Sequence, residues 1–488
     1  MVRRPVRGRN VRANTVCVIG AGPSGLAASK VLASRGIHFD CYEAGSGIGG
    51  LWRFGNDNGM SGIYESLHTN ISREGMAFDS LPMPDDYPIF PHHRQVLAYL
   101  ESYARTYSLY RHMRFRTEVT AARPRPDGDW EVVHQRRGEP QEETRRHTAV
   151  IVANGHHWDP RFPGPPIAGA DTFEGPMVHS HDYRTPRPYA NKRVLVVGMG
   201  NSACEISAEI SRTAARTFLS TRSGAHVIPR VILGRPADRL AASPLTGLPL
   251  FVKRPVLNLA LRLSRGRVTD YGLPEPDHRL LSAHPTCSDE LFVQLVRGAI
   301  TAKPGVAKFS RDHAVFTDGS REQVDAVVYA TGYKLSFPFL SPSVFSAEDG
   351  RTDLYLRTVP VDRAGLYFMG LAQPSGAAFP LLEEQAEWIA DLIDGSALPP
   401  PPVDMARANR RERRRHDRIY SHSYRHGIEV DCRTIRRALA RERRAGRRRL
   451  RDAAPAAPRS PGLPVPGPRP SVEPDTGDRR GMPPGRLR

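Results

Sequence analysis

Short apolar runs near the start of the chain predict buried parallel strands. Residues 15–19 (TVCVI) and 38–42 (HFDCY) are rich in apolar and β-branched side chains, and the first run shows no polar alternation. Residues 26–36 (LAASKVLASRG), between them, carry small and apolar side chains at helical spacing. Strands covered on both faces show such continuous runs, so the order strand, helix, strand predicts a βαβ unit.

The same order recurs near the middle of the chain. A strand is predicted at residues 193–197 (RVLVV), a helix at 204–214 (CEISAEISRTA) and another strand at 217–220 (TFLS). A later apolar run, at residues 325–329 (DAVVY), predicts a further strand. Two βαβ units in 488 residues indicate an α/β fold with two Rossmann-like dinucleotide-binding domains. No run of 18 apolar residues occurs, which argues against a membrane-spanning helix.

A glycine-rich turn follows the first predicted strand. It reads GAGPSG, and its candidate binding residues are Gly20, Gly22, Ser24 and Gly25. Glycines let the backbone approach a pyrophosphate, which binds at the N-terminus of the following helix. Glu43 ends the second strand, where a carboxylate accepts hydrogen bonds from a ribose. Strand, turn, helix and acid in this order predict a dinucleotide site.

A second glycine-rich turn follows the strand in the middle of the chain. Its sequence is GMGNSA, and its candidate residues are Gly198, Gly200, Asn201 and Ser202. Here the next strand ends near Arg222 rather than in an acid. A guanidinium in place of the carboxylate favours a ribose that carries a 2′-phosphate, so Arg222 predicts a preference for NADPH over NADH.

Two dinucleotide folds in one chain predict a flavin and a nicotinamide that share a cleft, because a hydride passes only between cofactors in contact. We therefore expect FAD at the first turn and NADPH at the second. The predicted parts are an FAD-binding domain split into 13–190 and 325–400, an inserted NADPH-binding domain (191–324), a basic, partly helical extension (401–451) and a disordered, Pro-rich tail (452–488).

One motif between the two glycine turns identifies a family. Phe173, Gly175, His179 and Tyr183 match the fingerprint FxGxxxHxxxY. The chain, over about residues 13–450, resembles the flavin-containing monooxygenases, which are class B flavoprotein oxygenases. Related Baeyer–Villiger enzymes usually have Trp at the position of Tyr183, so the resemblance favours the branch that oxygenates nitrogen and sulfur.

Two motifs after the first βαβ unit extend the resemblance. The sequence GGLW contains Gly50, Leu51 and Trp52 and is similar to the flavin-side turn of the family. The sequence HTNIS contains Asn70 and resembles the stretch whose Asn faces the flavin and the nicotinamide. The resemblance therefore identifies Asn70 as the catalytic candidate.

Two later motifs also match. The sequence ATGY, with Thr331 and Gly332, resembles the hinge where the chain returns from the nicotinamide domain. The sequence GLAQP, with Gln373, resembles the closing contact to the flavin. Ser223 stands where many relatives have a second Arg, so the predicted clamp on the 2′-phosphate has one cation fewer.

The resemblance implies an enzyme that depends on NADPH and O2. Reduced FAD would form a C4a-hydroperoxyflavin, which oxygenates a soft nucleophilic nitrogen or sulfur of a small molecule, while Asn70 donates a hydrogen bond. No cluster at metal-ligand spacing is found in the sequence, so no metal is expected. Baeyer–Villiger oxygenation of a ketone and uncoupled NADPH oxidation to hydrogen peroxide stay open as alternatives, because the motifs do not encode the substrate.

The charge of the chain raises a different class of function. The formal net charge is +19, but residues 407–451 carry +13 of it, and residues 13–406 are nearly neutral at −1. This distribution places the basicity on appendages. A solvated helical face explains an Arg-rich segment in most proteins, so nucleic acid is not expected as a partner, although binding through the extension is kept as the non-enzyme alternative. Five cysteines without a CxxC pair predict reduced thiols and a cytoplasmic protein.

Residues 245–265 (LTGLPLFVKRPVLNLALRLSR) form an apolar stretch with interspersed basic residues. Three interpretations stay open: a helical cover over the substrate path, a helix on a membrane surface, or plain core packing with a basic edge. Peripheral membrane contact and a homodimer are thus interactions that the sequence leaves open.

Overall fold

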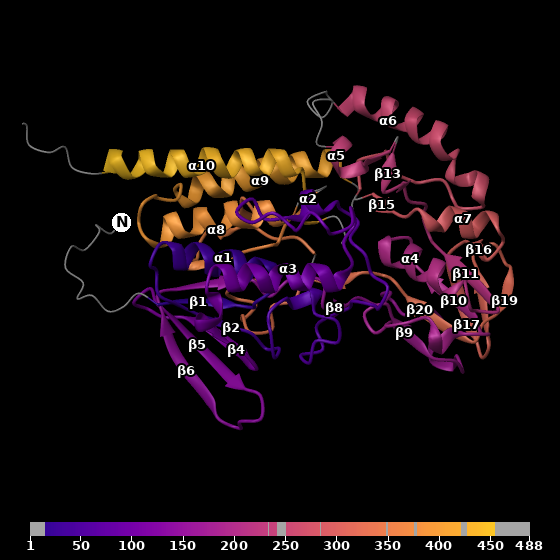
Figure 1. Ribbon diagram of the computed structural model, residues 1–488, viewed down its shortest axis with the longest axis horizontal. Helices are drawn as coiled ribbons and strands as arrows, with labels where there is room; N and C mark the ends of the chain where they lie inside the picture. The colour runs from indigo at the N-terminus through magenta and orange to yellow at the C-terminus, as the bar shows by residue number, and fades with distance from the viewer. Residues whose placement is uncertain are drawn as a thin grey trace, which may run out of the picture.

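Two five-stranded sheets form the centres of two neighbouring units, one toward each end of the molecule in Figure 1. The computed structural model describes residues 15–453 except 233, 242–249, 284, 348–349, 375–377 and 421–426. Nearly all of the predicted Pro-rich tail (452–488) lies outside the described residues. All neighbouring strands within the two sheets are parallel, which confirms the α/β class.

The first sheet is enclosed by helices and by a smaller sheet. Its strand order is β24-β7-β1-β2-β3, with β1 (Val16–Ile19), β2 (Phe39–Tyr42), β3 (Met113–Arg114), β7 (Ala149–Val152) and β24 (Leu366–Phe368). Helices α1 (Pro23–Ser34), α3 (His93–Thr106) and α8 (Phe379–Ile393) cover one face, and the antiparallel strands β4 (Thr117–Pro124), β5 (Trp130–Arg136) and β6 (Glu142–His147) lie on the other side (Figure 1). The first predicted βαβ unit is confirmed.

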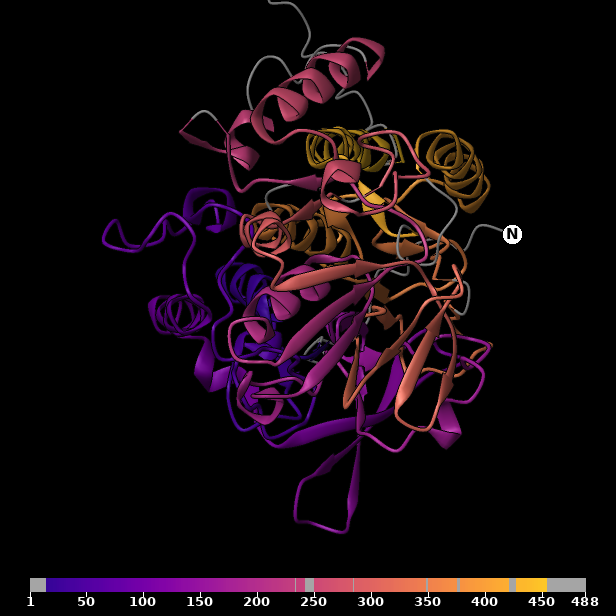
Figure 2. The same cartoon turned by 90° about the vertical axis from the view of Figure 1, so that its right-hand side faces the viewer.

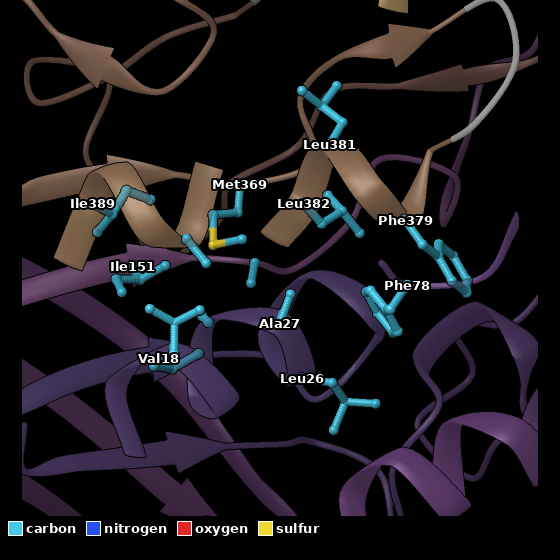
Figure 3. Close-up of a cluster of buried hydrophobic side chains, with 14 of the residues drawn as sticks. Val18, Leu26, Ala27, Phe78, Ile151, Met369, Phe379, Leu381, Leu382 and Ile389 are labelled. Carbon is cyan, nitrogen blue, oxygen red and sulfur yellow. The ribbon is translucent and has the colours of Figure 1, made fainter. Parts of the chain in front are cut away.

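Alternate residues of β1 face two different cores. Val16 and Val18 belong to the cluster beneath α1 and α8, whereas Cys17 and Ile19 belong to the cluster against β4 and β5. Figure 3 shows the first cluster, in which Val18 of the sheet lies near side chains of α1 and α8. Both faces of the strand are therefore removed from water, which is why the sequence is apolar at every position.

The second sheet repeats this plan. Its strand order is β16-β11-β10-β20-β9, with β9 (Met177–His179), β10 (Arg193–Val197), β11 (Arg216–Ser220), β16 (Ile300–Lys303) and β20 (Ala326–Tyr329). Helices α4 (Asn201–Ile210) and α7 (Glu290–Val296) pack on one face, and the antiparallel strands β17 (Val306–Ser310), β18 (His313–Phe316) and β19 (Arg321–Gln323) pack on the other. The second βαβ unit is also confirmed.

The predicted domain boundaries cut this second sheet. The strand β9 was expected in the first part of the FAD-binding domain and β20 in its second part, yet they pair with each other, with Val327 opposite Met177. The chain instead crosses between the units where β8 (Asp159–Pro160) pairs with β21 (Tyr333–Lys334). The predicted boundaries near 190 and 325 are therefore wrong. Local sequence patterns could not place them, because the pairing of these strands depends on contacts between residues far apart in the sequence.

The basic extension is not an appendage. It forms α9 (Pro402–Ile419), β26 (Glu429–Val430) and α10 (Cys432–Ala453), and the last of these packs along α8 (Figure 1). Ile435 and Leu439 of α10 and Met405 of α9 are buried in the same core as β1. The expectation of a separate basic segment fails because each helix buries a narrow apolar face beneath its many arginines.

Further helices and short paired strands lie outside the two five-stranded sheets. They are α2 (Arg73–Met76), β12 (Val227–Ile228), β13 (Val231–Ile232), β14 (Arg235–Pro236), α5 (Ala237–Ala241), α6 (Leu250–Arg265), β15 (Thr286–Cys287), β22 (Leu354–Tyr355), β23 (Val359–Pro360) and β25 (Gln373–Pro374). The helix α6 protrudes at the top of the molecule in both views (Figures 1 and 2).

Buried histidines make the fold sensitive to acid. Burial lowers the pKa of His147, at the end of β6, and of His179, at the end of β9, from 6.5 to about 4. The folded state holds these rings in the neutral form, whereas the unfolded chain binds protons below pH 6.5. The free energy of unfolding is therefore at its full value above pH 6.5 and decreases as the pH falls toward 4. We expect a loss of about 2–3 kcal/mol for each ring, which denaturant unfolding at pH 8 and pH 4.5 would measure. His147→Leu should flatten this pH dependence, and an unchanged slope would contradict the assignment.

Candidate functional site

A cavity of about 860 Å³ lies where the two units meet. Its wall includes the carboxyl end of β1, the segment that follows β7 and the first residue of α4. Ligands of parallel α/β folds bind at the carboxyl ends of strands, so the cavity has the expected position for a nucleotide cofactor. The larger part of its wall is apolar, with Asn, Glu, His and Asp side chains at a few positions.

The residues predicted to bind FAD gather on this wall. Those that line the cavity are Gly20, Gly22, Ser24, Glu43, Gly50, Leu51, Trp52 and Gln373. Gly25 lies just behind them, where a Cβ atom would overlap with the carbonyl oxygen of Gly20. The helix α1 begins after Gly22, and no side chain caps its first turn. Its N–H groups and its positive dipole end therefore face the cavity, as a pyrophosphate requires.

Glu43 occupies the position of the ribose-binding acid at the end of β2. Its carboxylate accepts hydrogen bonds from the backbone N–H of Ala21 and of Gly45, each at 2.7 Å, and from Nδ2 of Asn58 at 3.2 Å. Burial raises the pKa of Glu43, while these three donors act in the opposite direction. The donors hold the carboxylate against the glycine turn and at the cavity wall, which fits the ribose of a bound dinucleotide.

The second glycine turn has the same local geometry. Gly198 adopts φ +138°, and a Cβ atom there would overlap with the carbonyl oxygen of Ala330. The helix α4 begins after Gly200, again without a side-chain cap. Asn201 lines the cavity, and its Oδ1 atom accepts the backbone N–H of Cys287 at 2.8 Å.

The remaining residues predicted to bind NADPH lie outside the cavity wall. Gly198 and Gly200 lie in the turn between β10 and α4, and Ser202 is in the first turn of α4. Arg222 is exposed two residues beyond the end of β11, which is the neighbour of β10 in the sheet. This is the place of the ribose-binding residue in a βαβ unit, so the geometry fits a 2′-phosphate at Arg222.

The N-termini of two helices without side-chain caps, one from each unit, thus contribute to the wall of one cavity, α1 through its glycine turn and α4 through Asn201. Residues 13–441 match the model of the flavin-binding monooxygenase-like family. The chain belongs to this family. It is accordingly a flavin-dependent monooxygenase that uses FAD and NADPH.

Individual relatives agree with this membership. Flavin-containing monooxygenase 5 of Homo sapiens is 37% identical over 430 residues, which cover 85% of this chain and 80% of that protein. Dimethylaniline monooxygenase (N-oxide-forming) 2 of Mus musculus is 37% identical over 407 residues, which cover 80% and 76%.

Solved structures share the fold. The S-allyl-L-cysteine S-oxygenase from Allium sativum has a TM-score of 0.66 at 24% identity and covers 90% of this chain and 92% of that one. The cyclohexanone monooxygenase from Rhodococcus sp. Phi1, bound to NADP+, has a TM-score of 0.65 at 19% identity and covers 89% and 98%. Both support two Rossmann-like domains for this chain.

Asn70, the catalytic candidate from the monooxygenase motif, lies on the cavity wall. Its Oδ1 atom accepts a hydrogen bond from Nε of Arg230 at 3.2 Å. Arg230 also forms an ion pair with Glu205 of α4, with 2.8 Å between the guanidinium and carboxylate atoms. Burial disfavours the charge of Arg230, but Glu205 raises its pKa above the ordinary value. The sequence did not single out Arg230, because a single Arg in an Arg-rich chain carries no local signal.

The residues of the monooxygenase fingerprint do not line the cavity but hold the second sheet and α4 together. His179 is fully buried at the end of β9, and its Nδ1 atom accepts the backbone N–H of His181 at 3.0 Å. Tyr183 donates to Glu209 of α4 at 2.7 Å. Phe173 packs on Phe309 with ring centroids 5.4 Å apart. These residues fix the second sheet and α4 in place.

Gly175, Thr331 and Gly332 of the motifs make close backbone contacts in this same part of the structure. A Cβ atom at Gly175 would overlap with the carbonyl oxygen of Asp325, so only glycine fits this approach. Thr331 donates to the backbone oxygen of Arg161 at 2.5 Å, and the N–H of Arg161 donates to Gly332 at 3.0 Å. The ATGY motif therefore holds the crossing between the two units.

Sequence reasoning missed a cluster of wall residues after β7. His156, His157 and Trp158 line the cavity immediately beyond the carboxyl end of this strand. The short run AVIV at residues 149–152 lies outside both βαβ patterns, so nothing local in the sequence marks the carboxyl end of a parallel strand there. Burial lowers the pKa of His156 to about 4, so the ring stays neutral beside the predicted flavin site.

The helix α6 contributes apolar side chains to the cavity wall. Leu257 and Leu261 line the wall, in agreement with the helical-cover interpretation. On the outer side, Phe251 is 77% exposed and Leu263 is 80% exposed, which excludes plain core packing for that face. Within the described part of the chain, no helix is long and apolar enough to cross a bilayer. The membrane-surface interpretation stays a prediction that binding to anionic vesicles would test, and residues 245–249 lie outside the described residues.

Proposed function

We propose that this monooxygenase oxygenates a soft nucleophilic nitrogen or sulfur of a small molecule in a reaction that depends on NADPH and O2. The observation that carries the proposal is that the N-termini of two helices without side-chain caps contribute to the wall of one cavity, with Asn70 and an apolar wall beside them. Two relatives support the substrate class by name, one an N-oxide-forming enzyme and the other an S-oxygenase.

The residues of the chain supply binding, orientation and exclusion of water. The turns at Gly20 and Gly198 would hold the pyrophosphates of FAD and NADPH. Bound FAD, once reduced by NADPH, supplies the chemistry that activates O2. The apolar side chains of α6 and of residues 280–281 exclude water from the reacting atoms, and Asn70 donates a hydrogen bond toward them. No protein nucleophile is needed, since the substrate itself is the nucleophile.

The product distinguishes the competing reactions. A mixed panel of tertiary amines, thioethers and cyclic ketones would be incubated with NADPH under 18O2, and the products would be analysed by mass spectrometry. We expect one 18O atom in an N-oxide or a sulfoxide. A labelled lactone as the main product would instead favour Baeyer–Villiger oxygenation, and hydrogen peroxide alone would favour an uncoupled oxidase.

A cytoplasmic location is also proposed. None of the five cysteines forms a disulfide, and Cys17, Cys41 and Cys204 are buried. Cysteines that form no disulfide in a folded chain are typical of a reducing compartment. Fractionation of cells that express the chain would test this proposal.

Arg222 offers a test of the nicotinamide site. Arg222→Ala should raise the KM for NADPH by about 10- to 100-fold and leave the KM for NADH within about twofold, because only the 2′-phosphate needs the guanidinium. Steady-state kinetics with both nucleotides would measure the ratio. Arg216→Ala, at the exposed beginning of the same strand, is the matched control and should change neither constant. Equal losses for NADPH and NADH in Arg222→Ala would contradict the assignment.

A further inference from the structure

Arg230 joins the two units next to the reacting centre. It lies between β12 and β13, and its guanidinium contacts Asn70 of the first unit and Glu205 of the second unit at 3.2 and 2.8 Å. The Arg230 side chain is only 15% exposed and that of Glu205 only 19%. Nε of Arg230 contacts Asn70 and Nη2 contacts Glu205, so the planar guanidinium reaches the two partners with two separate nitrogens. A Lys side chain has a single nitrogen, which the charge of Glu205 would draw away from Asn70.

The backbone of Arg230 is fixed as well. Its N–H donates to a carboxylate oxygen of Asp289 at 2.9 Å, and its carbonyl oxygen accepts the N–H of Ala237 at 2.8 Å. The side chain therefore starts from an immobilised point on one unit. From there it reaches across to Asn70 on the other unit.

This contact determines which way the Asn70 amide points. A guanidinium donates hydrogen bonds and cannot accept them, so the amide oxygen must face Arg230. The amide nitrogen is then the group left for the cavity, where it can donate. Without Arg230, the oxygen and nitrogen of the amide could exchange places, and an acceptor would face the reacting atoms as often as a donor.

We propose that Arg230 is a positioning residue that sets the amide of Asn70 as a hydrogen-bond donor toward the bound cofactors. The inference rests on the proposed function for its chemical consequence, but not for its geometry. Glu205 holds the guanidinium in the required orientation. Because Arg230 contacts residues of both units, the Asn70 amide has the donor orientation only when the two units are packed together and both nucleotide sites are complete.

The test compares Arg230→Lys with Asn70→Ala. Arg230→Lys should lower the rate of substrate oxygenation by about tenfold and raise the fraction of NADPH electrons that leave as hydrogen peroxide by about three- to tenfold. The FAD content and the KM for NADPH should stay within about twofold. The visible absorption spectrum of the bound oxidised flavin should shift in the same direction in both variants, because both remove the same donor from the flavin.

A double variant separates positioning from a structural role. In the Asn70→Ala background, Arg230→Lys should change the peroxide fraction by less than about twofold, since the group that it orients is gone. Glu205→Gln keeps an acceptor for the guanidinium and is the matched control, with a smaller effect than Arg230→Lys. An Arg230→Lys effect of equal size in both backgrounds would overturn the proposal and leave only a structural ion pair.

The same experiment distinguishes failure of the proposed function. If the unaltered protein forms only peroxide with every substrate, the proposed function fails. The flavin spectra of the single and double variants still decide the role of Arg230 in that case. Spectra of Arg230→Lys identical to those of the unaltered protein would overturn the positioning role whatever the product.

Discussion

A Gly25→Ala variant should be purified without its flavin. Gly25 lies in the first turn of α1, and the added methyl group would overlap with the carbonyl oxygen of Gly20, which belongs to the turn that approaches the pyrophosphate. Backbone atoms cannot move aside as the end of a flexible side chain can. The helix must therefore shift away from β1 and Val18, and its N–H groups leave the position that binds phosphate. We expect FAD affinity to fall by at least about 100-fold and oxygenation to fall with it.

The ratio of flavin to protein absorbance after purification measures this loss, and FAD titration of the apoprotein quantifies it. Gly36→Asn is the control, because Gly36 lies just after the same helix, adopts φ +65°, and has open space where a Cβ atom would lie. Asn tolerates this left-handed conformation, so the control should retain its flavin. A yellow Gly25→Ala protein with full FAD content would show that the turn does not carry the pyrophosphate.

The local patterns of the sequence predicted the parts of the fold that depend on local contacts. The strand β1 is apolar at all four positions because it faces two cores, and this is visible in the sequence without any partner. The two glycine turns were equally visible, since each needs glycine to bring the backbone close to a neighbouring carbonyl group. The residues of both turns lie where the βαβ pattern placed them.

The parts that depend on distant contacts were not predicted. The strand β9 has three residues and is recognised as a strand of the second sheet only by its pairing with β20, some 150 residues later. Arg230 likewise has a role only because Asn70 and Glu205 approach it from separate segments. Such interactions leave no periodicity in the sequence, so no pattern rule could find them.

The Arg-rich extension shows a third kind of failure. Its charge density favours a solvated or anion-binding segment, and composition alone cannot reveal which arginines meet acids of the folded core. Arg443 and Arg447 of α10 in fact contact Asp391 of α8. The extension also supplies β26, which pairs with β25 at Gln373 on the cavity wall. The extension is therefore part of the first unit, which carries the predicted FAD-binding turn.

Asp391 is the acid that these arginines of α10 share. Its side chain is 1% exposed, and its carboxylate contacts Arg35 beyond α1 at 2.8 Å, Arg443 at 2.7 Å and Arg447 at 3.4 Å. Burial raises the pKa of this acid, yet the arginines outweigh that effect and hold it below the ordinary value. The carboxylate thus connects α1, α8 and α10, and the helices on this face of the first sheet depend on it.

Asp391→Asn should destabilise the protein by about 3–5 kcal/mol, because the change removes the charge but leaves the partly buried guanidiniums that faced it. Denaturant unfolding of the holoenzyme, followed by flavin release and by circular dichroism, would measure the loss. Asp404→Asn is the matched control, since its ion pair with Arg407 is about half exposed and should be worth less than about 0.5 kcal/mol. Equal stability of the two variants would contradict this role of Asp391. It would mean that the apolar side chains Ile435 and Leu439, rather than the ion pairs, attach α10 to the first unit.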